Sequence, residues 1–131
     1  MTAPASIGPR MAMLLGPFRG SALIATADLA DPGAESVILG SGMDRIDIVV
    51  VRLGGEIRAF LNECPHALTT LETFDGRFFD ADDPSLLVCS THGARFSALT
   101  GLCVAGPCLG RALAAVPVAV DDGIIRVAAD G

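Results

Sequence analysis

The chain has 131 residues, of which 51% are hydrophobic, and carries a formal net charge of −6 with every positive charge on arginine. This length predicts one domain with a sizeable core, and the acidic, lysine-free composition argues against nucleic acid as a partner because it repels phosphate. An acidic surface would instead suit docking on a basic patch of another protein.

The first twenty residues give the weakest structural signal. Residues 11–15 are apolar, but Pro17 follows closely and the run is too short for a secretory signal. No stretch approaches the roughly twenty apolar residues that a membrane span needs. We therefore expect residues 1–20 to be loosely ordered ahead of one domain over residues 21–131, in a soluble cytoplasmic protein without membrane contact. In that compartment four cysteines indicate metal ligands or free thiols before disulfides.

The first half of the domain reads as short strands separated by turns. Residues 25–29 are the one helix candidate, and they would form a single turn. The Asp-Pro-Gly sequence at residues 31–33 predicts a turn ahead of a strand near residues 35–39. The β-branched run at residues 46–53 is joined by a Gly-Gly pair to residues 56–62, which predicts a hairpin.

A second hairpin is predicted at the other end, where residues 113–120 and 124–128 flank an Asp-Asp-Gly turn. Short strands with frequent glycine and proline predict an all-β sandwich or barrel. Residues 63–110 lie between the two hairpins and contain all four cysteines and both histidines. Because sites usually lie on loops of a rigid scaffold, we expect the chemistry in this segment.

Two mixed motifs in this segment indicate a metal centre. Cys64 and His66 form a C-x-H motif, and Cys89 and His92 form a C-x-x-H motif. Two thiolates and two imidazoles could bind zinc, or an iron–sulfur cluster with histidine on one iron. Common zinc modules pair like with like, whereas here each motif is mixed, which favours a two-iron cluster held from both sides. The alternative is that these are ordinary buried thiols and histidines, but the only two histidines each lie within three residues of a cysteine.

The chain resembles the Rieske family, and most closely its soluble ferredoxin-type members. The resemblance extends from about residue 22 to residue 128 and rests on Cys64-Pro65-His66 with Leu71, on LVCSTHGARF at residues 87–96, on Thr100-Gly101, on Gly106-Pro107 and on a closing hairpin at residues 117–127. It implies a fold of stacked antiparallel sheets with two cluster-binding loops. It also implies one [2Fe–2S] cluster per chain, with Cys64 and Cys89 on one iron and His66 and His92 on the other.

The same resemblance assigns roles to residues near the motifs. A Gly-Pro loop like that at Gly106 would cover the cluster, and glycine at positions 93 and 106 would allow the close backbone approach that hydrogen bonds to sulfide require. The spacer between the motifs is longer than in compact members. We expect the extra residues to form an acidic turn at residues 80–84, away from the ligands.

Two further positions bear on the reduction potential. High-potential family members place a serine hydroxyl two residues after the second histidine ligand and a tyrosine hydroxyl two residues further on, whereas this chain has Ala94 and Phe96. Missing hydrogen-bond donors to the sulfurs disfavour the reduced form, so we expect a potential near the bottom of the Rieske range, at roughly −150 mV.

The remaining cysteines, Cys103 and Cys108, lie outside both motifs. High-potential respiratory members carry a disulfide between the two cluster loops, and neither motif here contains a spare cysteine for one. Cys103 and Cys108 could bridge each other, but we expect both to be reduced thiols.

The inventory of histidines limits the function. A mononuclear oxygen-activating iron needs two more histidines and a carboxylate, and both histidines are already assigned. We therefore expect a carrier and not an enzyme, taking single electrons from a flavoprotein reductase to a terminal oxygenase. The alternatives are a Rieske-like small subunit of a larger redox enzyme, such as a nitrite reductase, and a structural zinc or redox-sensing protein.

Overall fold

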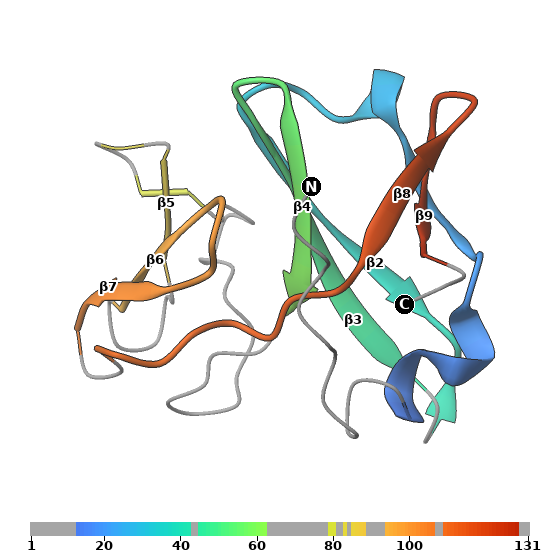
Figure 1. Ribbon diagram of the computed structural model, residues 1–131, viewed down its shortest axis with the longest axis horizontal. Coiled ribbons are helices and arrows are strands. Elements are labelled where there is room, and N and C mark those ends of the chain that lie inside the picture. The colour runs from blue at the N-terminus through green and yellow to red at the C-terminus, as the bar shows by residue number, and fades with distance from the viewer. Residues whose placement is uncertain are drawn as a thin grey trace, which may run out of the picture.

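The computed structural model describes residues 13–42, 45–62, 79–80, 83, 85–88, 94–106 and 109–128. Within them the strands form three antiparallel sheets of three strands each, with the orders β1-β9-β8, β2-β3-β4 and β5-β6-β7 (Figure 1). The strands are β1 (Ala22–Ala25), β2 (Gly33–Leu39), β3 (Ile46–Leu53), β4 (Glu56–Leu61), β5 (Leu86–Val88), β6 (Arg95–Ser97), β7 (Cys103–Ala105), β8 (Val118–Asp121) and β9 (Ile124–Val127). Two short 3-10 helices are η1 (Gly16–Phe18) and η2 (Thr26–Asp28). The expected all-β architecture is confirmed.

Both predicted hairpins are present, and their turns have the backbone that two-residue connections favour. Gly54 and Gly55 between β3 and β4 have φ of 60° and 82°, and Asp122 and Gly123 between β8 and β9 have φ of 53° and 76°. Two successive residues with positive φ match the twist of the flanking strands, which is why these dipeptides fix the hairpins locally.

Residues 113–117 differ from the prediction, because they are not part of β8. They run beside β4 instead: the Leu61 N–H donates to the Ala114 carbonyl at 2.8 Å, and the Val116 N–H donates to the Ala59 carbonyl at 2.8 Å. Pro117 has no N–H to continue this pairing. The chain therefore leaves β4 there and enters β8 one residue later.

The remaining differences concern the first strands. The helix candidate at residues 25–29 is the single turn η2, as expected, and β2 begins two residues earlier than predicted, at Gly33. The sequence pattern missed β1, an edge strand whose partner β9 is about a hundred residues away. A four-residue strand paired with a distant partner leaves no local signal.

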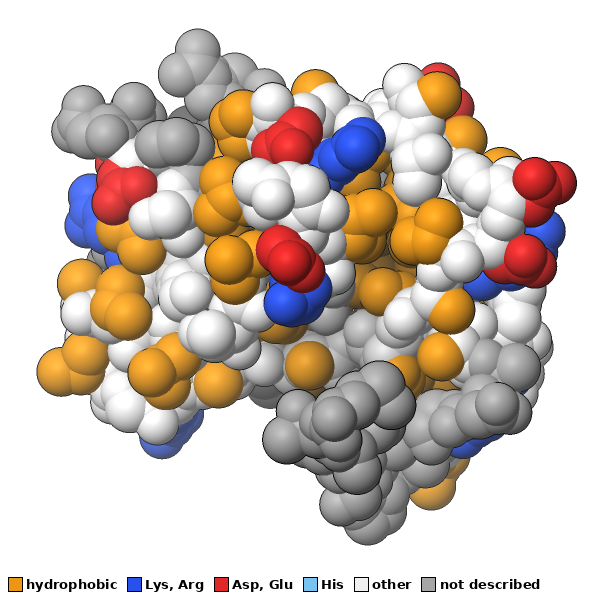
Figure 2. Space-filling model, turned by 45° about the horizontal axis from the view of Figure 1, so that its top comes forward, with side chains coloured by type: hydrophobic (Ala, Val, Ile, Leu, Met, Phe, Trp, Pro, Cys, Tyr) orange, Lys and Arg blue, Asp and Glu red, His pale blue; other side chains and the backbone are white. Residues whose placement is uncertain are grey.

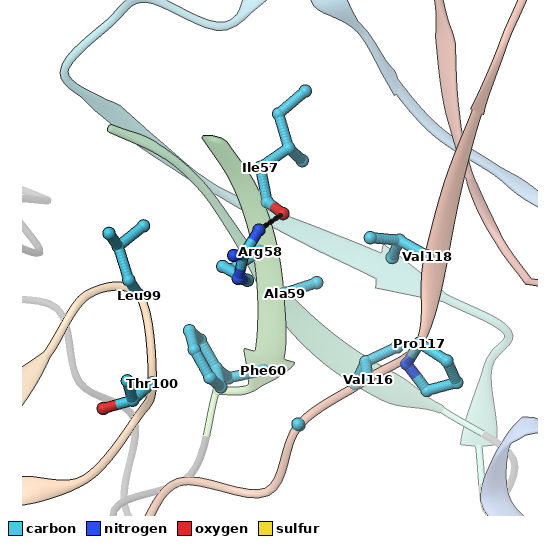
Figure 3. Close-up of a pocket in the computed structure, with 10 residues that line it drawn as sticks. Ile57, Arg58, Ala59, Phe60, Leu99, Thr100, Val116, Pro117 and Val118 are labelled. Atoms are coloured by element: carbon cyan, nitrogen blue, oxygen red, sulfur yellow. Dashed lines mark hydrogen bonds between the residues drawn. The ribbon is translucent and has the colours of Figure 1, made fainter. Parts of the chain in front are cut away.

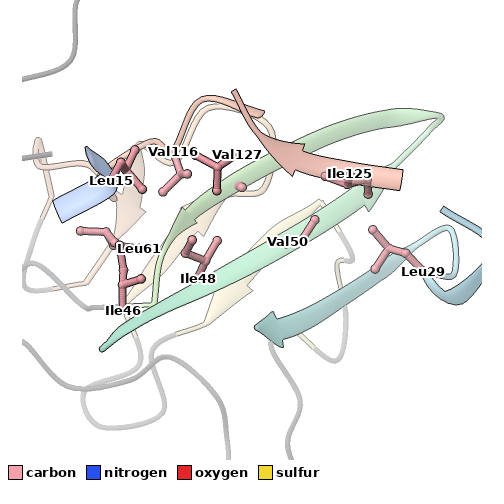
Figure 4. Close-up of a cluster of buried hydrophobic side chains, with 10 residues drawn as sticks. Leu15, Leu29, Ile46, Ile48, Val50, Leu61, Val116, Ile125 and Val127 are labelled. Atoms are coloured by element: carbon pink, nitrogen blue, oxygen red, sulfur yellow. The ribbon is translucent and has the colours of Figure 1, made fainter. Parts of the chain in front are cut away.

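The β2-β3-β4 sheet is the middle layer and is covered on both faces (Figure 1). Along β3, Val49 and Val51 belong to one core cluster, which includes Phe60 and Phe96. The alternate positions belong to a second cluster, drawn in Figure 4, which consists of Leu15, Leu29, Ile46, Ile48, Val50, Ala59, Leu61, Val116, Ile125 and Val127. Because both faces of β3 are buried, its sequence is continuously apolar instead of alternating.

The division of the chain at residue 21 stays a prediction. Leu15, on its N-terminal side, is packed in the second core cluster. No helix among the described residues has the length and apolar character needed to cross a membrane.

Candidate metal centre

The four proposed ligands, Cys64, His66, Cys89 and His92, lie outside the described residues. The structure does describe the residues that lead into both motifs and those that follow the second, and these define how the sheets present the motifs. Asn62 is two residues before Cys64, Val88 directly precedes Cys89, and Ala94 is two residues after His92.

The second motif is carried between the paired ends of β5 and β6. Val88 at the end of β5 pairs with Arg95 at the start of β6. The intervening Ala94 and the following Phe96 have no exposed surface, and both belong to the core cluster that packs on β3. The chain therefore enters and leaves the second motif at one edge of a rigid sheet, as a precise metal site requires.

The first motif follows β4, whose end is fixed by a partly buried polar network. The Asn62 N–H donates to the Asp47 carbonyl at 2.9 Å, and the Asn62 Nδ2 group donates to Asp47 Oδ1 at 3.4 Å. Ser36 Oγ donates to the same carboxylate oxygen at 2.6 Å. Asn62 is the one buried polar residue in the described part of the chain, and sequence analysis did not single it out. Asp47 and Asn62 thus set where the chain leaves the middle sheet, two residues before Cys64.

Gly106, directly after β7, lies against the backbone of Ala94. A Cβ atom placed on Gly106 would lie 2.7 Å from Ala94 Cα and 3.2 Å from Ala94 Cβ, and Gly106 has a φ of 100°. Both the contact and the backbone conformation exclude a side chain here. The segment that begins at Gly106 therefore starts in direct contact with the residue two positions after His92.

The acidic turn in the spacer between the motifs is partly described. The Asp80 N–H donates to the Leu86 carbonyl at 2.9 Å, and the Leu86 N–H donates to the Asp83 carbonyl at 3.1 Å, which agrees with the predicted turn. That the turn lies away from the ligands stays a prediction. The Asp80 carboxylate also forms an ion pair with Arg95. The first residue of this turn is thus tied to the end of β6 that follows the second motif.

Cys103 is a free, buried thiol on β7. Its Sγ lies 3.3 Å from the Ala105 carbonyl oxygen, to which it donates. Cys108 lies outside the described residues.

A groove of about 370 Å³ opens beside β4, where residues 116–118 diverge from that strand (Figure 3). Its walls are mainly apolar, and Arg58 is the one charged residue among its lining side chains. The Arg58 guanidinium donates to the Ile57 carbonyl at 2.9 Å and to Glu56 Oε2 at 3.2 Å. Leu99 and Thr100 on its other side belong to the turn after β6, at the far end of that strand from Ala94. On this side the groove therefore lies at the end of β6 that is opposite Ala94.

Comparison with known families matches residues 22–120 to the Rieske [2Fe-2S] domain, and this match spans both motifs. This chain belongs to the Rieske family. No curated protein sequence matches it significantly.

Several solved structures are similar to this Rieske domain. The ferredoxin of carbazole 1,9a-dioxygenase from Nocardioides aromaticivorans IC177 superposes with a TM-score of 0.65 at 27% identity, over 84% of this chain and 97% of that chain. A chain of the complex of reduced oxygenase and oxidized ferredoxin in carbazole 1,9a-dioxygenase superposes with a TM-score of 0.63 at 24% identity, over 82% of this chain and 91% of that chain. The terminal oxygenase of carbazole 1,9a-dioxygenase from Novosphingobium sp. KA1 superposes with a TM-score of 0.68 at 20% identity, over 91% of this chain and 34% of that chain. The last two, below 25% identity, show the shared fold alone.

The residues present fit the [2Fe–2S] cluster that the Rieske domain implies. Two cysteines and two histidines supply the mixed donor set that distinguishes Rieske centres from all-cysteine clusters. The missing side chain at Gly106 brings one backbone segment against another beside the second motif, the kind of approach that main-chain hydrogen bonds to sulfide require. Among the described residues, no group of three or more histidine, cysteine, aspartate or glutamate side chains could hold a metal ion.

Replacing Ala94 by serine together with Phe96 by tyrosine is expected to raise the reduction potential by roughly 100 mV, a fraction of the range that Rieske centres span. Both side chains are fully buried and apolar, so neither donates a hydrogen bond now. Voltammetry would compare the double variant with the wild type, which we expect near roughly −150 mV.

Ala98→Ser is the matched control for this prediction. Ala98 is as buried as Ala94 but lies just after β6, at the other end from the second motif, so its hydroxyl should leave the potential unchanged. A wild-type potential well above zero, or a double variant no higher than the wild type, would show that other donors set the potential.

Proposed function

We propose that this Rieske protein is a ferredoxin that carries single electrons from a flavoprotein reductase to a terminal oxygenase. It holds one [2Fe–2S] cluster, with Cys64 and Cys89 on one iron and His66 and His92 on the other. The bound cluster supplies a one-electron couple, and the protein itself performs no substrate chemistry. The protein works in the cytoplasm.

The observation that carries this proposal is the extent of the structural match. The chain covers 97% of a ferredoxin chain that is 27% identical, whereas it covers 34% of the similar terminal oxygenase chain. That ferredoxin is a component of carbazole 1,9a-dioxygenase, which supports an oxygenase as the acceptor. The reductase follows from the family resemblance alone.

The described residues support this role because they hold the ends of the two cysteine–histidine motifs in place. The Asp47–Asn62 network and the β5-β6 hairpin deliver the two motifs from separate sheets, and the core cluster around Phe96 keeps the second motif's strands fixed. A rigid frame limits the rearrangement that accompanies one-electron transfer. The electron would leave at the edge near His66 and His92, through a small and transient interface, as is usual for redox partners.

The test is reconstitution with defined components. The purified protein, a flavoprotein reductase and NAD(P)H would be combined with a panel of aromatic compounds, with and without the carbazole 1,9a-dioxygenase terminal oxygenase of Nocardioides aromaticivorans IC177. We expect the protein to be reduced in both mixtures, and hydroxylated product only when the oxygenase is present. Product formation without an oxygenase would refute the carrier role. Failure to pass electrons to the oxygenase, while its own ferredoxin does so, would refute the proposed acceptor.

A further inference from the structure

Exposed large hydrophobic side chains gather on one part of the described surface. In the described residues, those with the highest exposure are Met13, Ile38, Leu102, Val104, Leu109 and Val120. Three of them, Leu102, Val104 and Leu109, are 47%, 45% and 67% exposed and fall within eight residues of sequence, whereas the other three lie on separate elements. In Figure 2, hydrophobic side chains lie on the side of the molecule that carries β5–β7 in Figure 1, and also across the middle of the view.

Exposure and one bridge place these side chains on the outer side of β7. Leu102 directly precedes β7 and Val104 lies on it, and both are exposed, while Cys103 between them is buried in the core. The pairing of β6 with β7 is irregular at this point, so the exposed fractions, and not a regular strand alternation, support this placement. Leu102 also bridges to Ala112, and directly opposed residues share a face. Ala112 is exposed as well. Leu109 lies in the turn that brings the chain back beside β7. We call Leu102, Val104, Leu109 and Ala112 the β7 face.

The segment that forms the β7 face is almost free of charge. The chain has 15 acidic residues, yet residues 97–120 contain none, and Arg111 is their single charged residue. The net charge of −6 is therefore carried elsewhere. The segment that forms the β7 face therefore contributes no acidic side chain to the surface of the molecule.

One end of the β7 face, at Val104, lies near the second motif, while Leu102 at its other end is paired with Ser97. Gly106 touches Ala94, two residues after His92, and Val104 is two residues back along the same chain, or about 7 Å at the rise of a strand. Ala105 pairs with Arg95 at the end of β6 that follows the second motif. A protein seated on Val104 would thus lie beside the segment that holds Cys89 and His92.

We propose that the β7 face is the surface on which the terminal oxygenase docks, and that the complementary surface of the oxygenase is apolar and uncharged. This inference rests on the proposed function. Four side chains cover far less than the roughly 800 Å² per partner of a stable interface, so the contact suits a transient redox encounter and not a permanent dimer of this chain. Association driven by apolar burial depends little on ionic strength, unlike association between opposite charges.

The test compares two double variants with matched exposure and matched chemistry. Leu102→Thr with Val104→Thr changes the β7 face, and Ile38→Thr with Val120→Thr changes two side chains, 50% and 53% exposed, on other sheets. Threonine is β-branched, so strand formation is retained. Visible and EPR spectra would verify that all proteins keep the cluster. Stopped-flow mixing of reduced protein with the oxygenase from Nocardioides aromaticivorans IC177 would give the rate constant of electron transfer.

We expect the β7-face variant to transfer electrons about tenfold more slowly, equivalent to about 1.4 kcal/mol, and the control variant to stay within about twofold of the wild type. The wild-type rate constant should change less than about twofold between about 0.05 and 0.5 M salt. A steep fall with salt, or equal rate constants for the two double variants, would overturn the proposal.

Electron self-exchange between reduced and oxidised copies of the protein tests the role of the β7 face even if the proposed function is wrong. It needs no oxygenase, and NMR exchange broadening measures it. If the oxygenase accepts no electrons from the wild type, the proposal that an oxygenase is the acceptor is refuted. The self-exchange rate constants then still test whether electrons leave through the β7 face. Slower self-exchange only in the β7-face variant supports an apolar exit surface, and unchanged self-exchange refutes it.

Discussion

Replacement of His66 or His92 by alanine is expected to abolish the bound cluster, and with it the visible colour of the protein. Each substitution removes one of four donors, and no other histidine exists in the chain to replace it. Wild-type protein should contain roughly two irons and two sulfides per chain, as a Rieske centre requires, and either variant should contain almost none. Metal and sulfide analysis with EPR spectroscopy would measure this. The chain has no tryptophan or tyrosine, so the cluster should dominate its near-ultraviolet and visible spectrum.

Cysteine variants provide the matched control. Cys89→Ala should lose the cluster like the histidine variants, whereas Cys103→Ala should keep it. Cys103 is a free thiol buried in the core, where its loss removes one small side chain. Replacing it should lower the free energy of unfolding by about 1 kcal/mol without changing the iron content. Colourless wild-type protein with one bound zinc would contradict the cofactor assignment, and a normal Rieske spectrum in either histidine variant would contradict the ligand assignment.

Gly106→Ala is expected to destabilise both the fold and the cluster. The new methyl group would lie 2.7 Å from Ala94 Cα, a backbone atom that cannot move without shifting the start of β6. The φ of 100° adds backbone strain of about 1–2 kcal/mol, and the overpacking adds about 1–3 kcal/mol. Urea denaturation should therefore show a loss of roughly 2–5 kcal/mol in the free energy of unfolding, summing these two effects. The visible absorbance should decay faster in the presence of an iron chelator.

Gly110→Ala is the control that distinguishes the effect of backbone strain from the effect of the contact with Ala94. Gly110 lies four residues further along and has a similar φ of 91°, but a Cβ atom there would have nothing within 4 Å. Gly110→Ala should lower the free energy of unfolding by about 1–2 kcal/mol and leave unchanged the rate at which the visible absorbance of the cluster decays. If both variants lost the cluster at the same rate, the contact between Gly106 and Ala94 would not be what supports the second motif.

The sequence alone was sufficient wherever the determining interaction is local. The Gly-Gly and Asp-Gly turns predict both hairpins because the backbone conformation of two residues sets the pairing of the strands beside them. The two cysteine–histidine motifs indicate the Rieske family through residue type and spacing, and the family match over residues 22–120 agrees. The ligand residues themselves stay a prediction, since they lie outside the described residues.

Tertiary structure decided everything that depends on residues distant in sequence. The apolar run at residues 113–120 reads as one strand, but its first half pairs with β4 because that edge of the middle sheet is open, and Pro117 ends the pairing. The family resemblance predicts a close backbone approach at Gly106, but only the structure shows that the segment in contact with it is Ala94. The net charge is a sum over the whole chain and carries no positions, so the acidic docking surface that it suggests stays a prediction. The sequence shows that residues 97–120 contain no acidic residue. Only the folded arrangement of β7 and the segment beside it shows that apolar side chains are exposed there, because exposure depends on packing between residues distant in sequence.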